Sequence, residues 1–460
     1  MPGTFRPIRK LLVANRGEIA CRIMATCRRL GIATVAVHSE ADAGAAHVAA
    51  ADEAVAIGPA AARQSYLRAD AILDAARATG AEAIHPGYGF LAESAGFARA
   101  VTEAGLVWVG PSPDIIASMG DKDRAREIAR EAGVPILTGS GRMDEPSPAE
   151  LAKAAAGLGF PLLVKAACGG GGIGMRRVDS AADLGAVVAA TRSMAARAFG
   201  DGTVYLERFV ARARHVEVQV FGFGDGTAVH LFERDCSLQR RYQKIVEEAP
   251  APALPAALRS ALQEAAVRLA AAVRYAGAGT VEFIHDVARE EFHFLEMNTR
   301  IQVEHPVTEM VTGIDLVEWQ IRQAEGSLAA PPPLPPAPQG HAIEARLYAE
   351  RPERGFLPAP GTVSGLVWPE TGPDLRIDHA LRPGDRITPH YDPMIAKLIA
   401  RGPDRATALA RLRAALAETS VEGVATNIAF LGTLLDLPEV RAGEIDTGLI
   451  GRLTAARPAA

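Results

Sequence analysis

A short stretch, residues 292–305, carries a high density of side chains that could do chemistry. Its first half, F-H-F-L-E-M-N, has the pattern of a strand, in which residues two apart share a face, so Glu296 and Asn298 are expected to point the same way. A second carboxylate, Glu282, lies on the strand-like run 280–285, and the intervening D-V-A-R-E-E turn predicts a hairpin that brings it towards Glu296. Two carboxylates and an amide oxygen suit Mg²⁺ that carries nucleotide phosphates.

A cation, an amide and a carboxylate follow this candidate metal site directly, as Arg300, Gln302 and Glu304. The combination is typical of an active site that joins ATP to an anionic substrate. The alternative is a hairpin with a solvated polar edge. Pro306 and the apolar face of the strand favour an ordered element.

A glycine-rich segment follows a buried strand, P-L-L-V-K, that ends at Lys165. Five of the residues in 169–174 are glycines, among them Gly170 and Gly171, and glycine lets consecutive N–H groups curl around an anion. Lys165 could place a point charge on a phosphate. The segment lacks the G-x-x-x-x-G-K-[ST] pattern, so it is not a P-loop. A flexible linker is the alternative, although strand-like runs bound it on both sides.

Three other places remain open from spacing alone. The highly charged run 233–248 is expected to be a solvated face, with an anion site around Lys244 as the alternative. His215 is more often a satisfied structural histidine than a ligand. His85, Tyr88 and Phe90 follow a strand, where parallel sheets usually face ligands, but a tight Pro-Gly turn explains them equally well.

The elements that must position these residues alternate between strand and helix up to about residue 117, which predicts a parallel sheet with helices on its faces. No G-x-G-x-x-G follows the first strand, so a dinucleotide site there is unsupported. Further helices are expected at 148–158, 181–198, 255–275 and 404–418, and one that begins near Asp121. A proline-rich run at 330–338 marks a domain boundary, after which a strand carries Glu344 and Arg346.

The composition is that of an ordinary globular protein of about three domains. The 49 basic and 54 acidic residues give a net charge of −5, which predicts neither a nucleic-acid nor an anionic-membrane partner. No apolar run is long enough for a transmembrane helix, and the N-terminus lacks a signal-peptide hydrophobic region. The four cysteines show no zinc spacing, Cys21 and Cys27 are expected to pack within a helix, and a cytoplasmic location is the simplest expectation.

Together the motifs resemble those of biotin carboxylases, the ATP-grasp components of biotin-dependent acyl-CoA carboxylases, of the acetyl-CoA carboxylase type. The resemblance runs from about residue 8 to 450. It rests on L-L-V-A-N-R-G-E-I-A-C-R, H-P-G-Y-G-F-L-A-E, E-R-D-C-S-L-Q-R-R-Y-Q-K-I-V-E-E-A-P, F-L-E-M-N-T-R-I-Q-V-E-H-P-V-T-E and Y-D-P-M-I-A-K-L-I. It implies an α/β fold with a parallel N-terminal domain (1–117), an ATP-grasp domain (118–330) with a lid at about 137–207, and a mixed β/α C-terminal domain (339–455).

The resemblance also implies a reaction in two half-steps. Bicarbonate attacks the γ-phosphate of ATP, with Mg²⁺ or Mn²⁺, and the resulting carboxyphosphate delivers CO₂ to the N1′ nitrogen of carrier-bound biotin. The implied nucleotide-binding residues are Lys122, Lys165, Gly170, Gly171, Glu207, Arg208, Val210, His215, Gln239, Glu282 and Glu296. The implied metal ligands are Glu282, Glu296 and Asn298, and the implied bicarbonate pocket consists of Lys244, Arg300, Gln302, Val303 and Glu304. Glu304 would be the general base, Arg346 would stabilise the biotin enolate, and Tyr88 would pack near biotin.

Two positions depart from the family pattern. Ile173 stands where the glycine loop usually has Arg or Lys, and Tyr242 stands where His or Asn is frequent near the ribose. These changes bear on ATP affinity more than on reaction type. Cys236 falls beside the implied site, where a packing role is expected.

The resemblance implies a homodimer, and a biotin carrier and a carboxyltransferase on separate chains, since no biotin-accepting Met-Lys-Met segment occurs in the sequence. It does not identify the final acyl acceptor. Two alternatives are an ATP-grasp ligase that joins a carboxylate to an amine, and a regulatory relative that binds nucleotide without turnover. The set Glu282, Glu296, Lys244, Arg300, Glu304 and Arg346 argues against the regulatory alternative.

Overall fold

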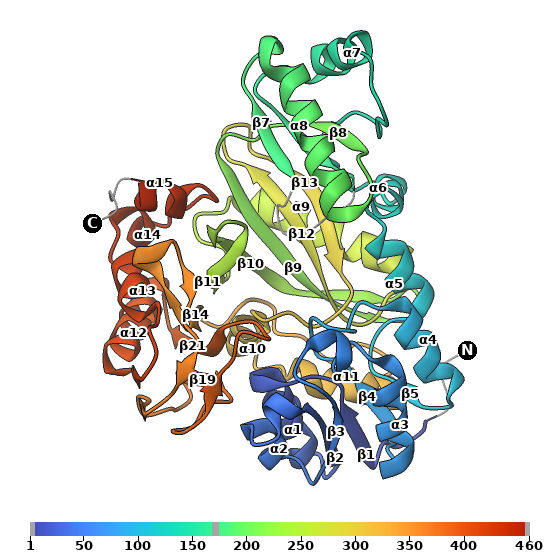
Figure 1. Ribbon diagram of the computed structural model, residues 1–460, viewed down its shortest axis with the longest axis vertical. Coiled ribbons are helices and arrows are strands. Elements are labelled where there is room, and N and C mark those ends of the chain that lie inside the picture. Colours follow the sequence, from blue (N-terminus) through green and yellow to red (C-terminus); the bar gives the residue numbers. More distant parts are fainter. Residues whose placement is uncertain (1–4, 168–173, 456–460) are drawn as a thin grey trace.

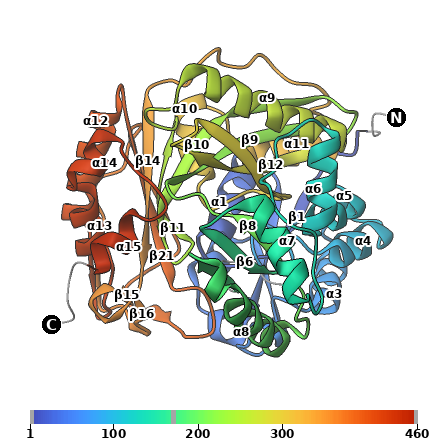
Figure 2. The same cartoon turned by 90° about the horizontal axis from the view of Figure 1, so that it is seen from above.

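The protein is a mixed α/β molecule with a parallel sheet at the N-terminal end and a long antiparallel sheet at its centre (Figures 1 and 2). The computed structural model describes residues 5–167 and 174–455. Among the helices in these ranges, none combines the length and apolarity needed to span a lipid bilayer.

The N-terminal sheet is parallel, with strand order β3-β2-β1-β4-β5, which confirms the α/β prediction for this part of the chain. Its strands are β1 (Lys10–Val13), β2 (Ala33–Ser39), β3 (Glu53–Gly58), β4 (Ala83–His85) and β5 (Val107–Trp108). The connecting helices are α1 (Gly17–Arg29), α2 (Ala46–Ala50), α3 (Ala69–Thr79) and α4 (Ala95–Glu103). The segments after β1 and β4 therefore leave the same edge of the sheet and lead to Glu18, in the first turn of α1, and to Tyr88.

The central sheet is antiparallel and has the strand order β13-β12-β9-β10-β11-β14-β21-β19. Its strands are β9 (Ala213–Phe223), β10 (Ala228–Arg240), β11 (Gln243–Ala249), β12 (Ala276–Asp286), β13 (Glu291–Asn298), β14 (His341–Tyr348), β19 (Leu375–His379) and β21 (Met394–Gly402). The sheet continues across the proline-rich run 330–338, since β11 pairs with β14. The division of the chain into three domains stays a prediction.

A small sheet, β7-β6-β8, projects from the body at the top of Figure 1. It consists of β6 (Leu162–Ala166), β7 (Met175–Val178) and β8 (Val204–Arg208), covered by α7 (Pro148–Leu158) and α8 (Ala181–Phe199). Both helices confirm the sequence prediction. The glycine-rich residues 169–172 and Ile173 lie outside the described residues, between β6 and β7.

The remaining helices cover the central sheet and connect its strands. They are α5 (Pro113–Gly120), α6 (Lys122–Glu131), α9 (Ala256–Ala272), α10 (His305–Thr312), α11 (Leu316–Glu325), α12 (Arg405–Glu418), α13 (Ile428–Leu435), α14 (Pro438–Ala442) and α15 (Leu449–Ala455). Figure 2 shows α12, α13 and α14 on one side of β14 and β21, where they share a hydrophobic core. Short strands β15 (Glu350–Arg351), β16 (Leu357–Pro358), β17 (Gly361–Thr362), β18 (Gly365–Val367), β20 (Arg386–Ile387) and β22 (Ser420–Glu422) complete the C-terminal part.

A buried histidine in the N-terminal part gives a testable pH dependence. His47 is fully buried, and burial lowers its pKa from 6.5 to about 4. Between pH 6.5 and pH 4 the unfolded chain takes up a proton on His47 that the folded protein does not. The free energy of unfolding is therefore highest above pH 6.5 and decreases as the pH falls towards 4. The difference in Tm between wild type and His47→Gln is therefore expected to narrow between pH 7 and pH 5. A difference that stays constant over this range would contradict the assignment of a neutral imidazole.

Candidate active site

The predicted hairpin is present and brings the two carboxylates together. Strands β12 and β13 pair antiparallel, with Glu282 opposite Glu296 and Thr280 opposite Asn298. The amide of Asn298 donates to Oε1 of Glu282 at 2.9 Å. The surrounding protein and the negative charge of Glu282 raise the pKa of Glu296, while Lys122 opposes this effect. A divalent cation between these carboxylates would relieve their repulsion, so the donor set fits the metal site that the sequence predicts.

The ammonium of Lys244 in β11 is the centre of the site. It donates to Oε2 of Glu217 at 2.6 Å, to Oε1 of Glu282 at 2.8 Å and to Oε1 of Glu304 at 2.6 Å. Burial alone would lower the pKa of Lys244, but the three carboxylates raise it well above its usual value. The lysine therefore stays charged and joins side chains from β9, β12 and the residue that precedes α10.

Arg346 in β14 provides a second cation on the other side of Glu304. Its guanidinium donates to Oε2 of Glu304 at 3.0 Å and to Oε1 of Glu247 at 2.6 Å. Burial opposes ionisation of Glu304, but Lys244 and Arg346 hold the pKa of this carboxyl well below its usual range. Burial raises the pKa of Glu247 to about 7 despite its contact with Arg346. Glu304 is thus ionised and held between two cations.

The loop between β13 and α10 brings its polar side chains to the same place. The amide of Gln302 donates to Oε1 of Glu282 at 2.8 Å, and Arg300 donates to Oδ1 of Asn298 at 3.1 Å. Nε of Arg300 also lies 3.0 Å from Oε2 of Glu93. The proposed bicarbonate residues and the proposed metal ligands therefore share hydrogen bonds.

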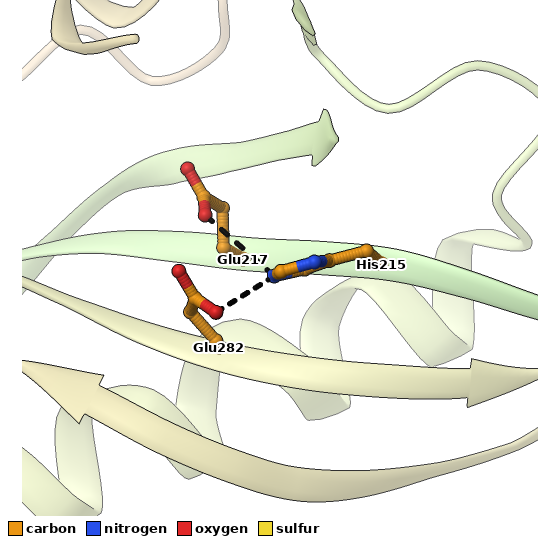
Figure 3. Close-up of side chains that lie close together, drawn as sticks. All are labelled: His215, Glu217 and Glu282. Carbon is orange, nitrogen blue, oxygen red and sulfur yellow. Dashed lines mark ion pairs between the residues drawn. The ribbon is translucent and has the colours of Figure 1, made fainter. Parts of the chain in front are cut away.

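His215 lies against two carboxylates, as Figure 3 shows. Its Nε2 is 2.9 Å from Oε2 of Glu282 and 3.9 Å from Oε2 of Glu217, while its Nδ1 lies 2.6 Å from the amide nitrogen of Gln239. Burial opposes a charged imidazole, but Glu282 raises the pKa of His215 above 6.5. The ring therefore belongs to the polar site, and its ligand atom and those of Glu217 and Glu282 lie within 4.8 Å of one another.

The prediction of a solvated face over 233–248 is wrong for the strand segments. Glu233, Arg234 and Asp235 in β10 and Glu247 and Glu248 in β11 are buried. Their charges are paired inside the sheet: for example, the fully buried Arg234 donates to Glu217 at 2.6 Å and to Gln302 at 2.9 Å. Charged side chains can be buried here because neighbouring strands supply opposite charges, which cannot be recognised from the charge of a single run.

Several residues that are expected to bind the nucleotide form a second cluster, at the small sheet and α6. Lys165 in β6 donates to Glu207 in β8 at 2.7 Å, and Arg126 in α6 donates to the other oxygen of Glu207 at 2.9 Å. Arg208 follows at the end of β8, and Val210 is buried beyond it. Lys122 is the first residue of α6, which Asp121 caps. Gly170 and Gly171 lie outside the described residues.

Tyr88 and Arg346, the two residues expected to contact biotin, interact electrostatically: burial raises the pKa of Tyr88 well above its usual value, although the Arg346 charge lowers it. The hydroxyl of Tyr88 donates to Oε1 of the buried Glu18, and the amide of Asn15 donates to the Tyr88 carbonyl at 2.7 Å.

Tyr242 lies in the turn between β10 and β11 and is 58% exposed. Cys236 is fully buried, and burial raises its thiol pKa well above the usual value, which agrees with a packing role.

Sequence reasoning missed several charged residues of this site: Glu18, Glu93, Glu217, Arg234, Glu247 and Lys397. One pattern in the sequence indicated Glu217, but not the other five. In H-V-E-V-Q-V, Glu217 and Gln219 alternate with valines, so a strand with two buried faces must place them opposite buried polar partners.

Family comparisons agree with this architecture over nearly the whole chain. The families described as "Biotin carboxylase, N-terminal domain", "Carbamoyl-phosphate synthase L chain, ATP binding domain" and "Biotin carboxylase C-terminal domain" match residues 7–116, 121–329 and 344–452. Biotin carboxylase 1 of Bacillus subtilis is 49% identical over 440 residues, which cover 96% of this chain and 97% of that protein. The mitochondrial methylcrotonoyl-CoA carboxylase subunit alpha of Oryza sativa subsp. japonica is 51% identical, and the match covers 97% of this chain and 60% of that protein.

Solved structures show the same fold. A biotin carboxylase from Campylobacter jejuni, in a beta-gamma-ATP complex, superposes with a TM-score of 0.91 at 40% identity, and the match covers 97% of this chain and 99% of that chain. The biotin carboxylase domain dimer of Hydrogenobacter thermophilus 2-oxoglutarate carboxylase, in complex with MgADP, ADP and bicarbonate, gives a TM-score of 0.89 at 42% identity, with 97% and 98% coverage. The chain belongs to the biotin carboxylase family of enzymes.

Proposed function

We propose that this protein uses ATP and bicarbonate to carboxylate the biotin of a carrier protein by way of carboxyphosphate, the first half-reaction of an acyl-CoA carboxylase. The observation that carries the proposal is the position of Glu304, a buried carboxylate that two fixed cations, Lys244 and Arg346, contact from the neighbouring strands β11 and β14. One cation lies beside the proposed metal ligands, and the other lies beside the proposed biotin site. A single carboxylate is thus shared by the two half-steps.

The first half-step needs charge neutralisation and alignment more than covalent chemistry. Mg²⁺ or Mn²⁺ would be held by Glu282, Glu296 and Asn298 and would neutralise phosphate charge. Lys122, Lys165, Glu207, Arg208, Val210, His215 and Gln239, with Gly170 and Gly171 of the glycine loop, would bind the nucleotide. The small sheet with α7 and α8 would act as the lid that keeps water from the labile carboxyphosphate.

Lys244, Arg300, Gln302, Val303 and Glu304 would bind bicarbonate. Glu304 is ionised in this structure, and its low pKa makes it a weak base while Lys244 is bound to it. Anionic oxygens of bicarbonate and phosphate would compete for the Lys244 ammonium, which would raise the proton affinity of Glu304. The base would therefore gain strength when its substrates bind, as proton transfer requires.

The second half-step needs a cation for the biotin anion, because the ureido nitrogen is a very weak acid. Arg346 would supply this charge, with Glu247 holding its Nε at 2.6 Å and Tyr88 packing near the ring. Glu304 contacts the same guanidinium. The carboxylate that would take the proton of bicarbonate is therefore adjacent to the proposed biotin site.

The proposal includes partners. The protein would work as a homodimer with a biotin carrier and a carboxyltransferase on separate chains, and the dimer of the related Hydrogenobacter thermophilus domain supports the homodimeric part of this proposal. Relatives that this chain resembles include methylcrotonoyl-CoA carboxylase subunits alpha, at 51% and 49% identity. The acyl group finally carboxylated would be set by the carboxyltransferase.

Replacing Glu296 with glutamine is expected to weaken the productive use of Mg-ATP. The substitution keeps the size of the side chain but removes one of the two negative charges that face each other at the β12–β13 pair. The Mg²⁺ concentration for half-maximal ATP cleavage should rise at least about tenfold, as loss of one charged ligand would predict. Wild-type magnesium dependence in this variant would remove Glu296 from the metal site.

Incorporation of isotopically labelled bicarbonate into biotin tests the proposed function. The assay contains the purified protein, Mg-ATP, labelled bicarbonate and either free biotin or a purified biotinylated carrier. Acid-labile label on biotin, formed only when ATP is present, is the expected result. Absence of labelled biotin with both acceptors, while the protein remains folded, would contradict it.

A further inference from the structure

Lys397 is a fully buried lysine at the junction between the loop that carries Glu304 and the C-terminal strands. Its ammonium donates to the carbonyl of Val303 at 2.7 Å. On β21 it lies directly opposite Arg346 of β14, so the two cations share one face of the central sheet. The residue thus contacts the loop of the proposed bicarbonate pocket from the strand next to the proposed biotin site.

The charge of Lys397 is compensated by residues from two other elements. Its Nζ lies 3.4 Å from Oε2 of Glu18, which is in the first turn of α1. It also lies 3.6 Å from Oδ2 of Asp378 in β19. Burial alone would lower the pKa of Lys397, but Glu18, Glu344 and Asp378 raise it. The side chain therefore remains an ammonium, as a donor to a carbonyl requires.

The Val303 carbonyl, which accepts a hydrogen bond from Lys397, does not accept one from the helix α10 that follows. Glu304 is the N-cap of α10, and Val303 precedes it, so the Val303 carbonyl lies outside the hydrogen bonds of the helix. The neighbouring Gln302 carbonyl is held by Nδ1 of His305 at 2.7 Å. Lys397 supplies the corresponding contact for the peptide that joins Val303 to Glu304.

Two other proposed substrate residues meet at the same point. Glu18, which pairs with Lys397, also accepts the hydroxyl of Tyr88. Arg346 occupies the neighbouring position on β14 and contacts Glu304 at 3.0 Å. A shift of the Lys397 side chain would therefore displace the backbone of Glu304 relative to both of its cations.

We propose that Lys397 is a positioning residue for Glu304, and that its hydrogen bond to the Val303 carbonyl fixes the carboxylate between Lys244 and Arg346. Lys397 does not touch a reacting group in this account and acts through the peptide it orients. The inference rests on the proposed function, since it gives Glu304 the role of base. A misplacement of about 1 Å at a reacting group costs on the order of 100-fold in rate.

The test compares four proteins: wild type, Lys397→Met, the double variant Lys397→Met with Glu18→Gln, and the control Arg77→Met. Methionine keeps most of the length of the lysine but cannot donate to Val303. The Glu18→Gln change removes a carboxylate that would otherwise lack its cation, so the double variant separates loss of folding from loss of positioning. Arg77 is 61% exposed on α3, a helix that carries none of the proposed site residues.

Bicarbonate-dependent ATP cleavage without biotin is measured for each, with kcat/KM for bicarbonate, KM for ATP, and Tm. We expect kcat/KM for bicarbonate to fall about 100-fold in both Lys397 variants, with KM for ATP within about twofold of wild type. The double variant should recover Tm without recovering kcat/KM, and Arg77→Met should match wild type.

The outcomes separate the two proposals. Wild-type kcat/KM for bicarbonate in the folded Lys397 variants would overturn the positioning role and leave the proposed function standing. Equal losses towards ATP and bicarbonate, or unfolding of both variants, would show a structural role and overturn the inference. Absence of bicarbonate-dependent ATP cleavage in the wild type would overturn the proposed function, and the positioning role with it.

Discussion

Replacing Glu304 with glutamine is expected to lower bicarbonate-dependent ATP cleavage and biotin carboxylation together, by about 1,000-fold. Glutamine keeps the shape of the side chain but cannot take the proton of bicarbonate, and general base catalysis contributes about 10² to 10⁴ in rate. Loss of the charge also removes one of three carboxylates from Lys244, which keeps its contacts with Glu217 and Glu282. The measurement is kcat/KM for bicarbonate under saturating Mg-ATP.

A matched control is Glu264→Gln, at an exposed position of α9 that is 71% accessible. This variant should behave as wild type. Activity of Glu304→Gln within about fivefold of wild type would exclude a general base role, because the loss would lie far below the range of base catalysis. Both variants should keep the Tm of wild type within a few degrees, since each change preserves side-chain volume.

Replacing Arg346 with serine is expected to separate the two half-steps. Biotin carboxylation should fall by about 100-fold or more, because a fixed cation for a developing anion typically contributes 10² to 10³ in rate. Bicarbonate-dependent ATP cleavage should fall by less than about tenfold, since Lys244 still contacts Glu304. The two activities are measured on the same preparation, as labelled biotin and as released phosphate.

The substitution also leaves Glu247 buried without its cation. The pKa of Glu247 is already raised to about 7 by burial, so this carboxyl can take up a proton and limit the loss of stability. A double variant, Arg346→Ser with Glu247→Gln, removes the remaining charge and keeps the comparison within a folded protein. Equal loss of both activities in the double variant would contradict a role for Arg346 that is specific to biotin.

The sequence predicts the local parts of this site well. The hairpin that pairs Glu282 with Glu296 is encoded within one short segment, by alternation in the strands and by the turn between them. The parallel N-terminal sheet and the helices α7, α8 and α12 are likewise predicted by local patterns. Strand and helix periodicity acts over a few residues, so it can be recognised without knowing which elements meet.

The contacts that make the site work come from strands that are distant in the chain. Glu247 and Arg346 are 99 residues apart, and they meet because β11 pairs with β14. Lys244 contacts carboxylates on two other strands and on the loop before α10, which no single run reveals. The charged run 233–248 misled for the same reason, since the burial of Arg234 depends on Glu217 and Gln302, which lie on other elements.

The most direct test of the central claim is the steady-state rate of phosphate release from Mg-ATP by the purified protein, with and without bicarbonate and free biotin. The account predicts little phosphate release without bicarbonate, and a strong increase in its rate when both bicarbonate and biotin are present. The two half-steps are expected to be linked because Arg346, the cation for biotin, contacts Glu304, the base for bicarbonate. Phosphate release that is the same with and without biotin, in the free form and on a purified carrier, would contradict it.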